Sequence, residues 1–311
     1  MTITTHSAEA NTAFRRWAVL ISITLATMQY AMAILVVSVV LPQMQGSLSA
    51  TQDEIAWVMT FNILATAVIT PMSGWLAARF GRRQVMLGSM AGFTVATLFC
   101  GIAPNLPFLV LFRIAQGAFG APLIPIGQAI ILDTFPKHQH GVATSVFGMA
   151  VVVGPVIGPI WGGWLAEDYG WPAAFFMFLP FGVIALAGLY LFLTDKSKPS
   201  DVTLDWTGFL SLSVAVICLQ LLLSRGQRND WFESPEIIIE TVLAFIAFHV
   251  FVVHSLTAHR PFLEPRLLLD RNFLIGLIIV LIYGMLNFTP MVLLPPMLQS
   301  LLGYPDSVIG I

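Results

Sequence analysis

One arginine stands inside a long apolar run, and its position demands a chemical explanation. Arg113 lies in the run 107–132, and Gln116 and Gly117 follow it by one helical turn. If this run spans a membrane, an embedded charge costs at least about 2.5–3.5 kcal/mol, so it is expected to serve a function. Two hypotheses remain open: the guanidinium acts inside the protein, or it extends to the outer headgroups.

Helix-breaking residues recur at helical spacing in the segment GPVIGPIWGGW. Gly154, Gly158 and Gly162 follow one another in steps of four, and Pro155 and Pro159 keep the same step. In water these residues oppose a helix, but in lipid the helix persists because unsatisfied backbone groups are costly. Glycines spaced by four let a neighbouring backbone approach closely. The stripe is therefore either an ordinary helix contact or a seam that moves during function.

Three arginines cluster in the segment GWLAARFGRR, immediately after an apolar run. We expect Gly74 and Gly81 to keep the turn tight around the basic side chains, which are Arg79, Arg82 and Arg83. One interpretation is simple anchoring at the cytoplasmic surface. The other is a gate in which the arginines contact helix-end carbonyls.

Other chemistry is disfavoured by the sequence. We recognise no nucleophile–base pair, metal-ligand cluster or phosphate-binding loop, so we expect neither an enzyme nor a cofactor. Cys100 and Cys218 lie in apolar runs and are expected to be buried thiols. Asp133 and Glu240 stand at the ends of runs, where solvated caps are expected. The histidines of the run 237–257, His249 and His254, could titrate near neutral pH, but a hydrogen bond to a neighbouring helix is favoured.

The composition is that of a membrane protein. The chain is 57% hydrophobic and 10% charged, its mean hydropathy is +0.86, and soluble domains carry about 25% charged residues. Apolar runs long enough to span a bilayer recur along the chain. The predicted spans are 17–42, 55–77, 85–103, 107–132, 142–166, 172–193, 206–224, 237–257 and 273–300. No signal-peptide cleavage site follows the first run, and a tenth span is expected to begin near Ser307.

Basic residues set the predicted orientation, because cytoplasmic loops are enriched in Lys and Arg. Eleven of the fourteen lie at one side of the predicted spans: Arg15, Arg16, Arg79, Arg82, Arg83, Lys137, Lys196, Lys198, Arg260, Arg266 and Arg271. Arg225 and Arg228 lie on the other side, where acidic residues collect. We therefore expect the N-terminus to be cytoplasmic.

These motifs together resemble a known family. The segment GMAVVVGPVIGPIWGGWL resembles the fifth-span antiporter signature of major facilitator superfamily drug exporters. GWLAARFGRR resembles the superfamily's loop motif, and LFRIAQGAFGAP its fourth-span motif with the embedded arginine. LPQMQGSLSATQDEIAWVMT and WPAAFFMFLPFG are similar to the corresponding runs of Emr-type multidrug exporters. The region from Asp205 to Phe273 is similar to the insert of the fourteen-span branch.

The resemblance implies an all-α polytopic fold. The expected parts are a cytoplasmic tail 1–16, a six-span bundle 17–193, a linker 194–205, a two-span insert with its following loop 206–272, and the start of an incomplete second bundle 273–311. We expect the chain to be a fragment, a truncated gene product or half of a split protein, because no second copy of the loop motif is recognised.

The resemblance also implies a proton-coupled exporter of the inner membrane, often docked to a periplasmic adaptor. Arg113 would then serve proton translocation. Two positions depart from the family pattern: Ala78 replaces the acidic residue of the loop motif, and Ala33 replaces an aspartate of the first span. The energy source is expected to be the proton gradient, although no proton-carrying residue is identified.

The substrate cavity is expected to be apolar with few polar anchors, which suits hydrophobic or amphipathic compounds. Its expected residues are Gln29, Phe61, Asn62, Gln116 and Asn287, with Tyr30 beside them. Two alternatives stay open: a metabolite carrier on the same scaffold, and a membrane remnant without transport activity.

Overall fold

The computed structural model describes residues 2–194 and 202–303, without the side chains of 2–12 and of several positions between 288 and 300. Throughout this part of the chain every regular element is a helix, and eight segments are long and apolar enough to span a membrane. The predicted all-α membrane fold is confirmed. The helices form two units, residues 1–200 with 295–311 and residues 201–294, each described below by itself.

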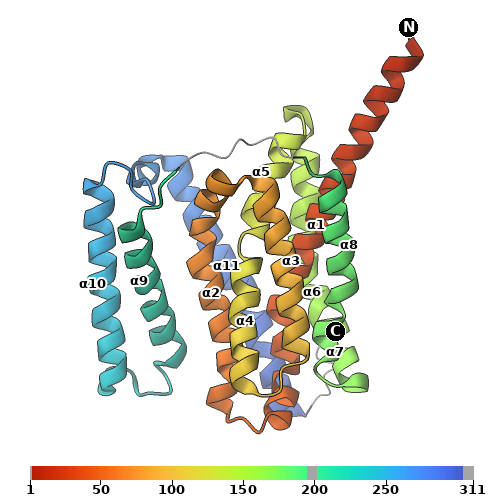
Figure 1. Ribbon diagram of the computed structural model, residues 1–311. Coiled ribbons are helices and arrows are strands. Elements are labelled where there is room, and N and C mark those ends of the chain that lie inside the picture. Colours follow the sequence, from red (N-terminus) through yellow and green to blue (C-terminus); the bar gives the residue numbers. More distant parts are fainter. Residues whose placement is uncertain (1, 195–201, 304–311) are drawn as a thin grey trace. The chain divides into compact units, whose positions relative to one another are not determined.

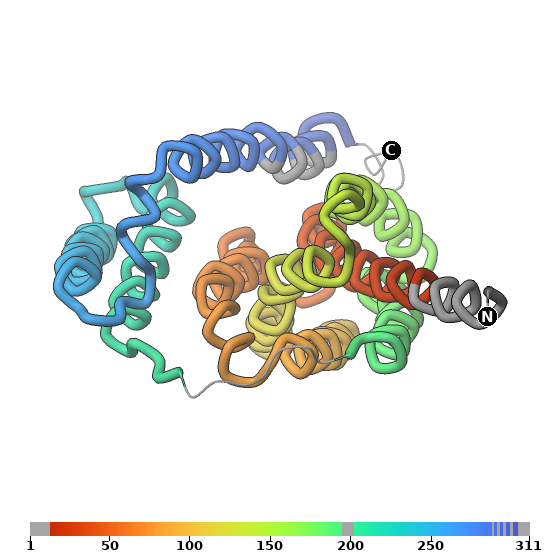
Figure 2. The backbone as a smooth tube through the Cα atoms, turned by 90° about the horizontal axis from the view of Figure 1, so that it is seen from above, coloured from red at the N-terminus to blue at the C-terminus, as the bar shows by residue number. Residues whose placement is uncertain are grey.

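The first unit contains the six predicted spans of the N-terminal bundle. Its helices are α1 (Thr2–Ser47), α2 (Gln52–Phe80), α3 (Arg82–Gly101), α4 (Leu106–Gly120), α5 (Leu123–Thr134), α6 (His140–Tyr169), α7 (Ala173–Phe176) and α8 (Phe178–Phe192). Helix α1 contacts α6 and α8, whereas α4 contacts α2 and α3 (Figure 1). Seen from above, α1 runs among the other helices of this unit (Figure 2).

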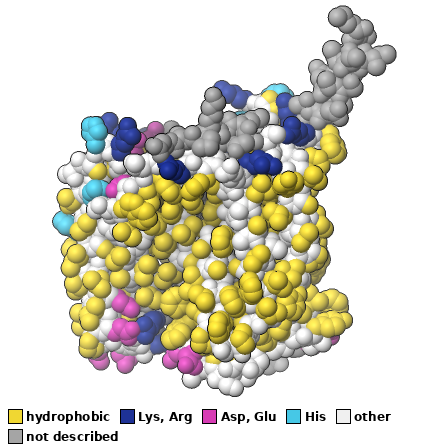
Figure 3. Space-filling view, viewed as in Figure 1, with side chains coloured by type: hydrophobic (Ala, Val, Ile, Leu, Met, Phe, Trp, Pro, Cys, Tyr) yellow, Lys and Arg dark blue, Asp and Glu magenta, His cyan; other side chains and the backbone are white. Residues whose placement is uncertain are grey.

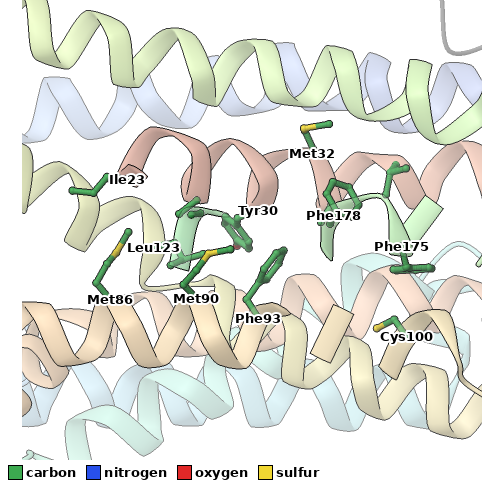
Figure 4. Close-up of a cluster of buried hydrophobic side chains, with 14 of the residues drawn as sticks. Ile23, Tyr30, Met32, Met86, Met90, Phe93, Cys100, Leu123, Phe175 and Phe178 are labelled. Carbon is green, nitrogen blue, oxygen red and sulfur yellow. The ribbon is translucent and has the colours of Figure 1, made fainter. Parts of the chain in front are cut away.

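The centre of the first unit is an apolar core. Helix α1 is buried over most of its span, because it contacts other helices on several sides. Ile23 of α1, Met90 and Phe93 of α3 and Phe175 of α7 are at most 1% exposed (Figure 4). Outside the core, lipid-compatible side chains such as Tyr190 and Leu191 remain exposed. This pattern is expected of a helix bundle surrounded by hydrocarbon.

Two predicted spans are interrupted at prolines. The span 107–132 divides into α4 and α5 at Ala121–Pro122, and the span 172–193 divides into α7 and α8 at Met177, three residues before Pro180. A proline lacks the N–H that would bond the carbonyl four residues earlier. By contrast, Pro155 and Pro159 lie inside the unbroken helix α6, as predicted for this segment in lipid.

The N-terminal segment is helical. A cytoplasmic tail was expected over residues 1–16, and α1 begins at Thr2 and continues without a break to Ser47. Extending an existing helix costs far less than nucleating one, so this segment continues the first span as a helix, and its cytoplasmic location stays a prediction.

The second unit contains the insert. Helices α9 (Trp206–Arg225) and α10 (Pro235–Thr257) pack against each other and match two predicted spans. Helix α11 (Arg271–Leu302) follows and covers the predicted span 273–300. Its first part, Arg271–Asn287, is a shorter apolar helix than the eight candidate spans. The predicted tenth span and Lys196 and Lys198 of the predicted linker lie outside the described residues. The other domain boundaries remain predictions.

Candidate functional site

Arg113 lies in the interior of the first unit. Its side chain is 1% exposed, so it does not extend to the membrane surface, and the snorkelling hypothesis is wrong. Helix α4 carries it between α1, α2 and α3, where Leu109 and Val58 are fully buried. A buried guanidinium needs hydrogen-bond acceptors, because its desolvation is otherwise uncompensated.

The guanidinium joins three helices through oxygen acceptors. Nε donates to the carbonyl of Val58 in α2 at 3.2 Å, and Nη1 donates to the carbonyl of Ala33 in α1 at 3.3 Å. Nη1 also donates to Oε1 of Gln116, one turn further along α4. All three acceptors are uncharged. The backbone of Ala33, where the resemblance expected an aspartate, thus contributes directly to the arginine site.

A polar network extends from Arg113 to the neighbouring helices. The Nε2 of Gln116 donates to Oγ1 of Thr97 in α3 at 2.7 Å, and the Nδ2 of Asn62 in α2 donates to the carbonyl of Arg113 at 2.8 Å. Asn62 and Gln116 are at most 3% exposed. Both were expected to line the substrate cavity, but their amide donors are engaged in holding α2, α3 and α4 together.

Gly117 allows α2 to approach α4 beside this network. A Cβ at this position would overlap the backbone oxygen of Asn62. One turn later, a Cβ at Gly120 would overlap the ring of Tyr30, whose hydroxyl donates to Oγ1 of Thr66 at 3.1 Å. The space beside Gly117 is therefore filled by a neighbouring helix.

The glycine stripe of α6 contacts the backbone of α1. A Cβ at Gly154 would lie 2.8 Å from the carbonyl oxygen of Met28, and one at Gly158 would lie 2.9 Å from the carbonyl oxygen of Met32. A Cβ at Gly162 would overlap a methyl group of Val36. The partners on α1 recur in the same steps of four. We call this contact the α1–α6 seam.

Only one of the two loop-motif glycines meets the predicted need for a tight turn. Gly81 separates α2 from α3 with a φ of +86°, a conformation that side chains other than glycine rarely adopt. Gly74 lies inside α2, and a Cβ there would meet nothing within 4 Å. The expectation for Gly74 is therefore wrong in this structure, because the turn begins only after Phe80.

The loop-motif arginines tie the end of the bundle together. Arg82 forms an ion pair with Asp133 at the end of α5, although Asp133 was expected to be a solvated cap. Arg83 donates through Nε to the carbonyl of Leu193 at 2.6 Å and through Nη2 to the carbonyl of Tyr190 at 3.1 Å. These are contacts to helix-end carbonyls of the kind that the gating hypothesis requires, and the gating role itself stays a prediction. Arg79, in the last turn of α2, is not without a partner either.

Of the other residues expected in the cavity, Phe61 and Gln29 of the first unit line different pockets, and Asn287 belongs to the second unit. Phe61 lines an open pocket of about 500 Å³ with Glu54 and Asn105 near the ends of α2 and α4. Asn287 lies in α11, where its amide donates to the carbonyl of Tyr283 one turn earlier at 3.0 Å. Gln29 lines a separate, small cavity. The shared substrate cavity therefore stays a prediction.

In the second unit, the capping role of Asp205 was not predicted from the sequence, and the surroundings of Glu240 were predicted wrongly. Asp205 caps α9, and its carboxylate accepts from the Gly208 N–H at 3.0 Å, the Phe262 N–H at 3.0 Å and Nε2 of His254 at 2.8 Å. The N-cap position of Asp205 before an apolar run was the available signal. Glu240 is 8% exposed rather than solvated, because α9 covers it. His254 makes the predicted kind of hydrogen bond to a neighbouring helix.

The family model of the Major Facilitator Superfamily matches residues 20–311. The chain belongs to the major facilitator superfamily. Its similarity to solved superfamily structures concerns the fold alone: a peptide transporter POT in complex with sulfate is 16% identical, with a TM-score of 0.58 over 77% of this chain and 53% of that one. A bacterial homologue of the lysosomal transporter Spinster, in an inward-facing occupied conformation, has a TM-score of 0.52 over 95% and 71% of the chains, at 20% identity.

Curated superfamily relatives are more similar in sequence. The Multidrug export protein EmrB of Escherichia coli K12 is 34% identical over 292 residues, which are 94% of this chain and 57% of that protein. The Fatty acid resistance protein FarB of Neisseria gonorrhoeae is 35% identical over 294 residues, or 94% and 58%. This superfamily chain therefore spans somewhat more than half the length of the curated relatives it matches.

Proposed function

We propose that this multi-span membrane protein is the N-terminal part of an exporter of hydrophobic or amphipathic small molecules. Relatives about one third identical over 94% of the chain carry names that refer to multidrug export and fatty acid resistance. A metabolite carrier on the same scaffold is the alternative, and a remnant without transport is a second one.

The observation that carries this proposal is the α1–α6 seam. At Gly158 the two helices meet through backbone atoms, with the hypothetical Cβ 3.1 Å from the Cα of Met32 as well as 2.9 Å from its oxygen. Such a face is smooth, because no side chain of the glycine stripe interdigitates with α1. Superfamily transporters work by rigid movements of helix bundles, and packed interfaces prefer two discrete arrangements over continuous deformation. A smooth seam inside the first bundle suits that motion.

Proton antiport is the proposed source of energy. Among the described residues of the first unit, the buried polar side chains include Arg113 but no carboxylate and no histidine. The positive charge of Arg113 would raise the electrostatic free energy of any further cation placed nearby. Arg113 would therefore interact with a proton or a substrate charge at the bundle surface. We assign the proton-carrying group to a segment outside this unit.

The proposed location is the inner membrane, with the N-terminus in the cytoplasm and a periplasmic adaptor as a partner. On the face seen in Figure 3, hydrophobic side chains cover the middle, and Lys and Arg gather at the end where α1 begins. Arg15, Arg82 and Arg83 belong to that end. The positive-inside rule favours this orientation. The adaptor follows from the resemblance to Emr-type exporters.

The test is efflux by the full-length protein in a bacterium that lacks its own drug pumps. Ethidium accumulation should fall when the protein is expressed, and a protonophore should restore it. If the protein is present in the membrane at normal abundance and ethidium accumulation is the same as in cells without it, the export proposal is contradicted. Uptake of a polar metabolite in the same cells would instead support the carrier alternative.

A further inference from the structure

An open pocket lies at the first turns of α2 and α4, and it is separate from the Arg113 network. The pocket borders the turn that joins α1 to α2, its volume is about 500 Å³, and all of its lining residues belong to the first unit. Among the described residues that line it, none makes a hydrogen bond in the network around Arg113. A ligand can therefore bind here without displacing a contact of that network.

Helix α2 lines the pocket with one carboxylate and two aromatic rings. Glu54, Trp57 and Phe61 are spaced by three and four residues, so they share one face of the helix. Trp57 is 42% exposed, and its ring lies edge-on to the ring of Phe61, with the centroids 6.4 Å apart. The indole thus remains accessible to a ligand. Among aromatic side chains the indole attracts cations most strongly, and quaternary ammonium groups are recognised in this way.

The Glu54 carboxylate is fixed in place but keeps one oxygen free. Its Oε2 accepts from the backbone N–H and from the hydroxyl of Thr51, both at 2.9 Å, in a capping box at the start of α2. Within the described part of the chain, its Oε1 has no hydrogen-bond partner. No Lys, Arg or His is found among the described residues that line the pocket. The pocket therefore carries a negative charge that no lining residue compensates.

The start of α4 does not require an anion in this pocket. A helix N-terminus attracts negative charge when its first N–H groups lack acceptors. Here the Oδ1 of Asn105 accepts from the N–H of Phe108 at 3.2 Å, and Pro107 has no N–H. The full charge of Glu54 therefore sets the preference of the pocket, which is for a cation.

We propose that this pocket binds a small organic cation in which a quaternary ammonium group is attached to an apolar substituent. The ammonium group would lie against the ring of Trp57 and pair with Oε1 of Glu54. The apolar substituent would contact Phe61 and Val110, which line the same pocket. Binding here does not depend on the proposed export.

The test compares two probes of the same shape that differ in charge, benzyltrimethylammonium and neopentylbenzene. NMR titrations of the probe methyl signals would use the purified chain in maltoside micelles, with empty micelles to subtract partitioning. The wild-type protein should bind the cation about tenfold more tightly than its neutral counterpart, because only the cation gains from the indole and the carboxylate. Equal binding of the two probes, or no binding beyond empty micelles, would overturn the proposal.

Matched variants separate the carboxylate from general effects. In Glu54→Gln the capping box with Thr51 is retained, because glutamine also serves at this position, and only the charge is lost. This variant should keep the wild-type melting temperature, bind the cation about fivefold more weakly and bind neopentylbenzene as before. Asp53→Asn removes a charge from the same turn, but Asp53 does not line the pocket, so cation binding should stay unchanged. An unchanged preference in Glu54→Gln, or an equal loss in Asp53→Asn, would contradict the site.

A second arm distinguishes two sources of the ammonium group, because the choline headgroup of a phospholipid carries the same group as a soluble compound. The titrations are repeated with the chain in phosphatidylcholine nanodiscs, with empty nanodiscs as the reference. Binding of benzyltrimethylammonium that depends on Glu54 and persists in these nanodiscs assigns the pocket to soluble cations. Binding that depends on Glu54 in maltoside and is lost in phosphatidylcholine assigns it to the lipid headgroup. Binding that is independent of Glu54 in both media overturns the proposal.

Discussion

At position 113 a permanently charged group is held by uncharged oxygens from three helices. The acceptors are the backbone of Val58 and Ala33 and the side chain of Gln116. Replacing a buried charge by a hydrophobic residue of similar volume is often neutral or stabilising. A charge that is kept at this cost is expected to serve a function rather than the fold.

Arg113→Met should therefore keep membrane abundance and thermal stability close to wild type while abolishing efflux of ethidium by the full-length protein. Arg113→Lys should also fail, because a single ammonium cannot donate to Val58, Ala33 and Gln116 in the same planar geometry. The measurements are ethidium efflux and the melting temperature in detergent. Efflux at the wild-type rate in Arg113→Met would reduce the arginine to a structural role.

For the helices, the α1–α6 seam predicts that alanine substitutions at different glycines of α6 reduce ethidium efflux to different extents. In Gly158→Ala the new methyl group meets backbone atoms of Met32 and can be accommodated only if the helices separate. We expect a cost of about 1–3 kcal/mol in the state described here. This cost should shift the populations of the transporter's states and abolish ethidium efflux, with substrate binding retained.

Gly148→Ala is the matched control, because it lies on the same helix and a Cβ there meets nothing within 4 Å. The Gly148→Ala variant should export ethidium at the wild-type rate. Gly162→Ala should also reduce ethidium efflux, because its methyl group would overlap a methyl of Val36, a buried β-branched residue whose χ1 is restricted in a helix. Normal efflux in Gly158→Ala would show that the seam only packs helices.

The cap of α9 makes a pH-dependent prediction for the second unit. Partial burial raises the pKa of Asp205, but hydrogen bonds from Gly208, His254 and Phe262 outweigh it and leave the pKa below its ordinary value of 3.8. A depressed folded-state pKa means that this stabilisation is present above the unfolded pKa and is lost as the pH falls through the folded one. Hydrogen exchange at the Gly208 and Phe262 amides should therefore accelerate only in strong acid.

Asp205→Asn should remove that acid-dependent step, because an amide keeps the cap but does not titrate in this range. Asp270→Asn is the control, because Asp270 accepts from the Asn272 and Phe273 N–H groups at the start of α11. This variant should leave hydrogen exchange at the Phe262 amide unchanged. The same acid dependence in Asp205→Asn would refute the assignment.

For the whole molecule, the orientation makes a labelling prediction. Cysteines introduced at Ser49, between α1 and α2, and at Tyr169, the last residue of α6, should react with an impermeant thiol reagent added to intact cells. A cysteine at His138, at the other end, should react only after the cells are opened. Cys100 and Cys218 are buried and should contribute little background. The reverse pattern would place the N-terminus outside.

The sequence by itself determined that the chain is a membrane protein, where most of its spans lie and which superfamily it resembles. These properties depend on local composition, on the cost of burying charge in lipid and on motifs that are contiguous in the chain. The helical state of the Gly154–Gly162 stripe was predicted for the same reason, whereas a functional role for Arg113 stays a prediction. The helical start of α1 and the break at Pro122 were not predicted.

Only the tertiary structure decided which side chains meet. Helical spacing places Gln29, Asn62 and Gln116 on faces of their helices, but it does not say which neighbouring helix covers each face. In the folded bundle, Asn62 and Gln116 hold neighbouring helices together around Arg113, whereas the buried amide of Gln29 is left unpaired. In a membrane every helix can remain helical in many arrangements, so the contacts between helices must come from packing rather than from the sequence of any one helix.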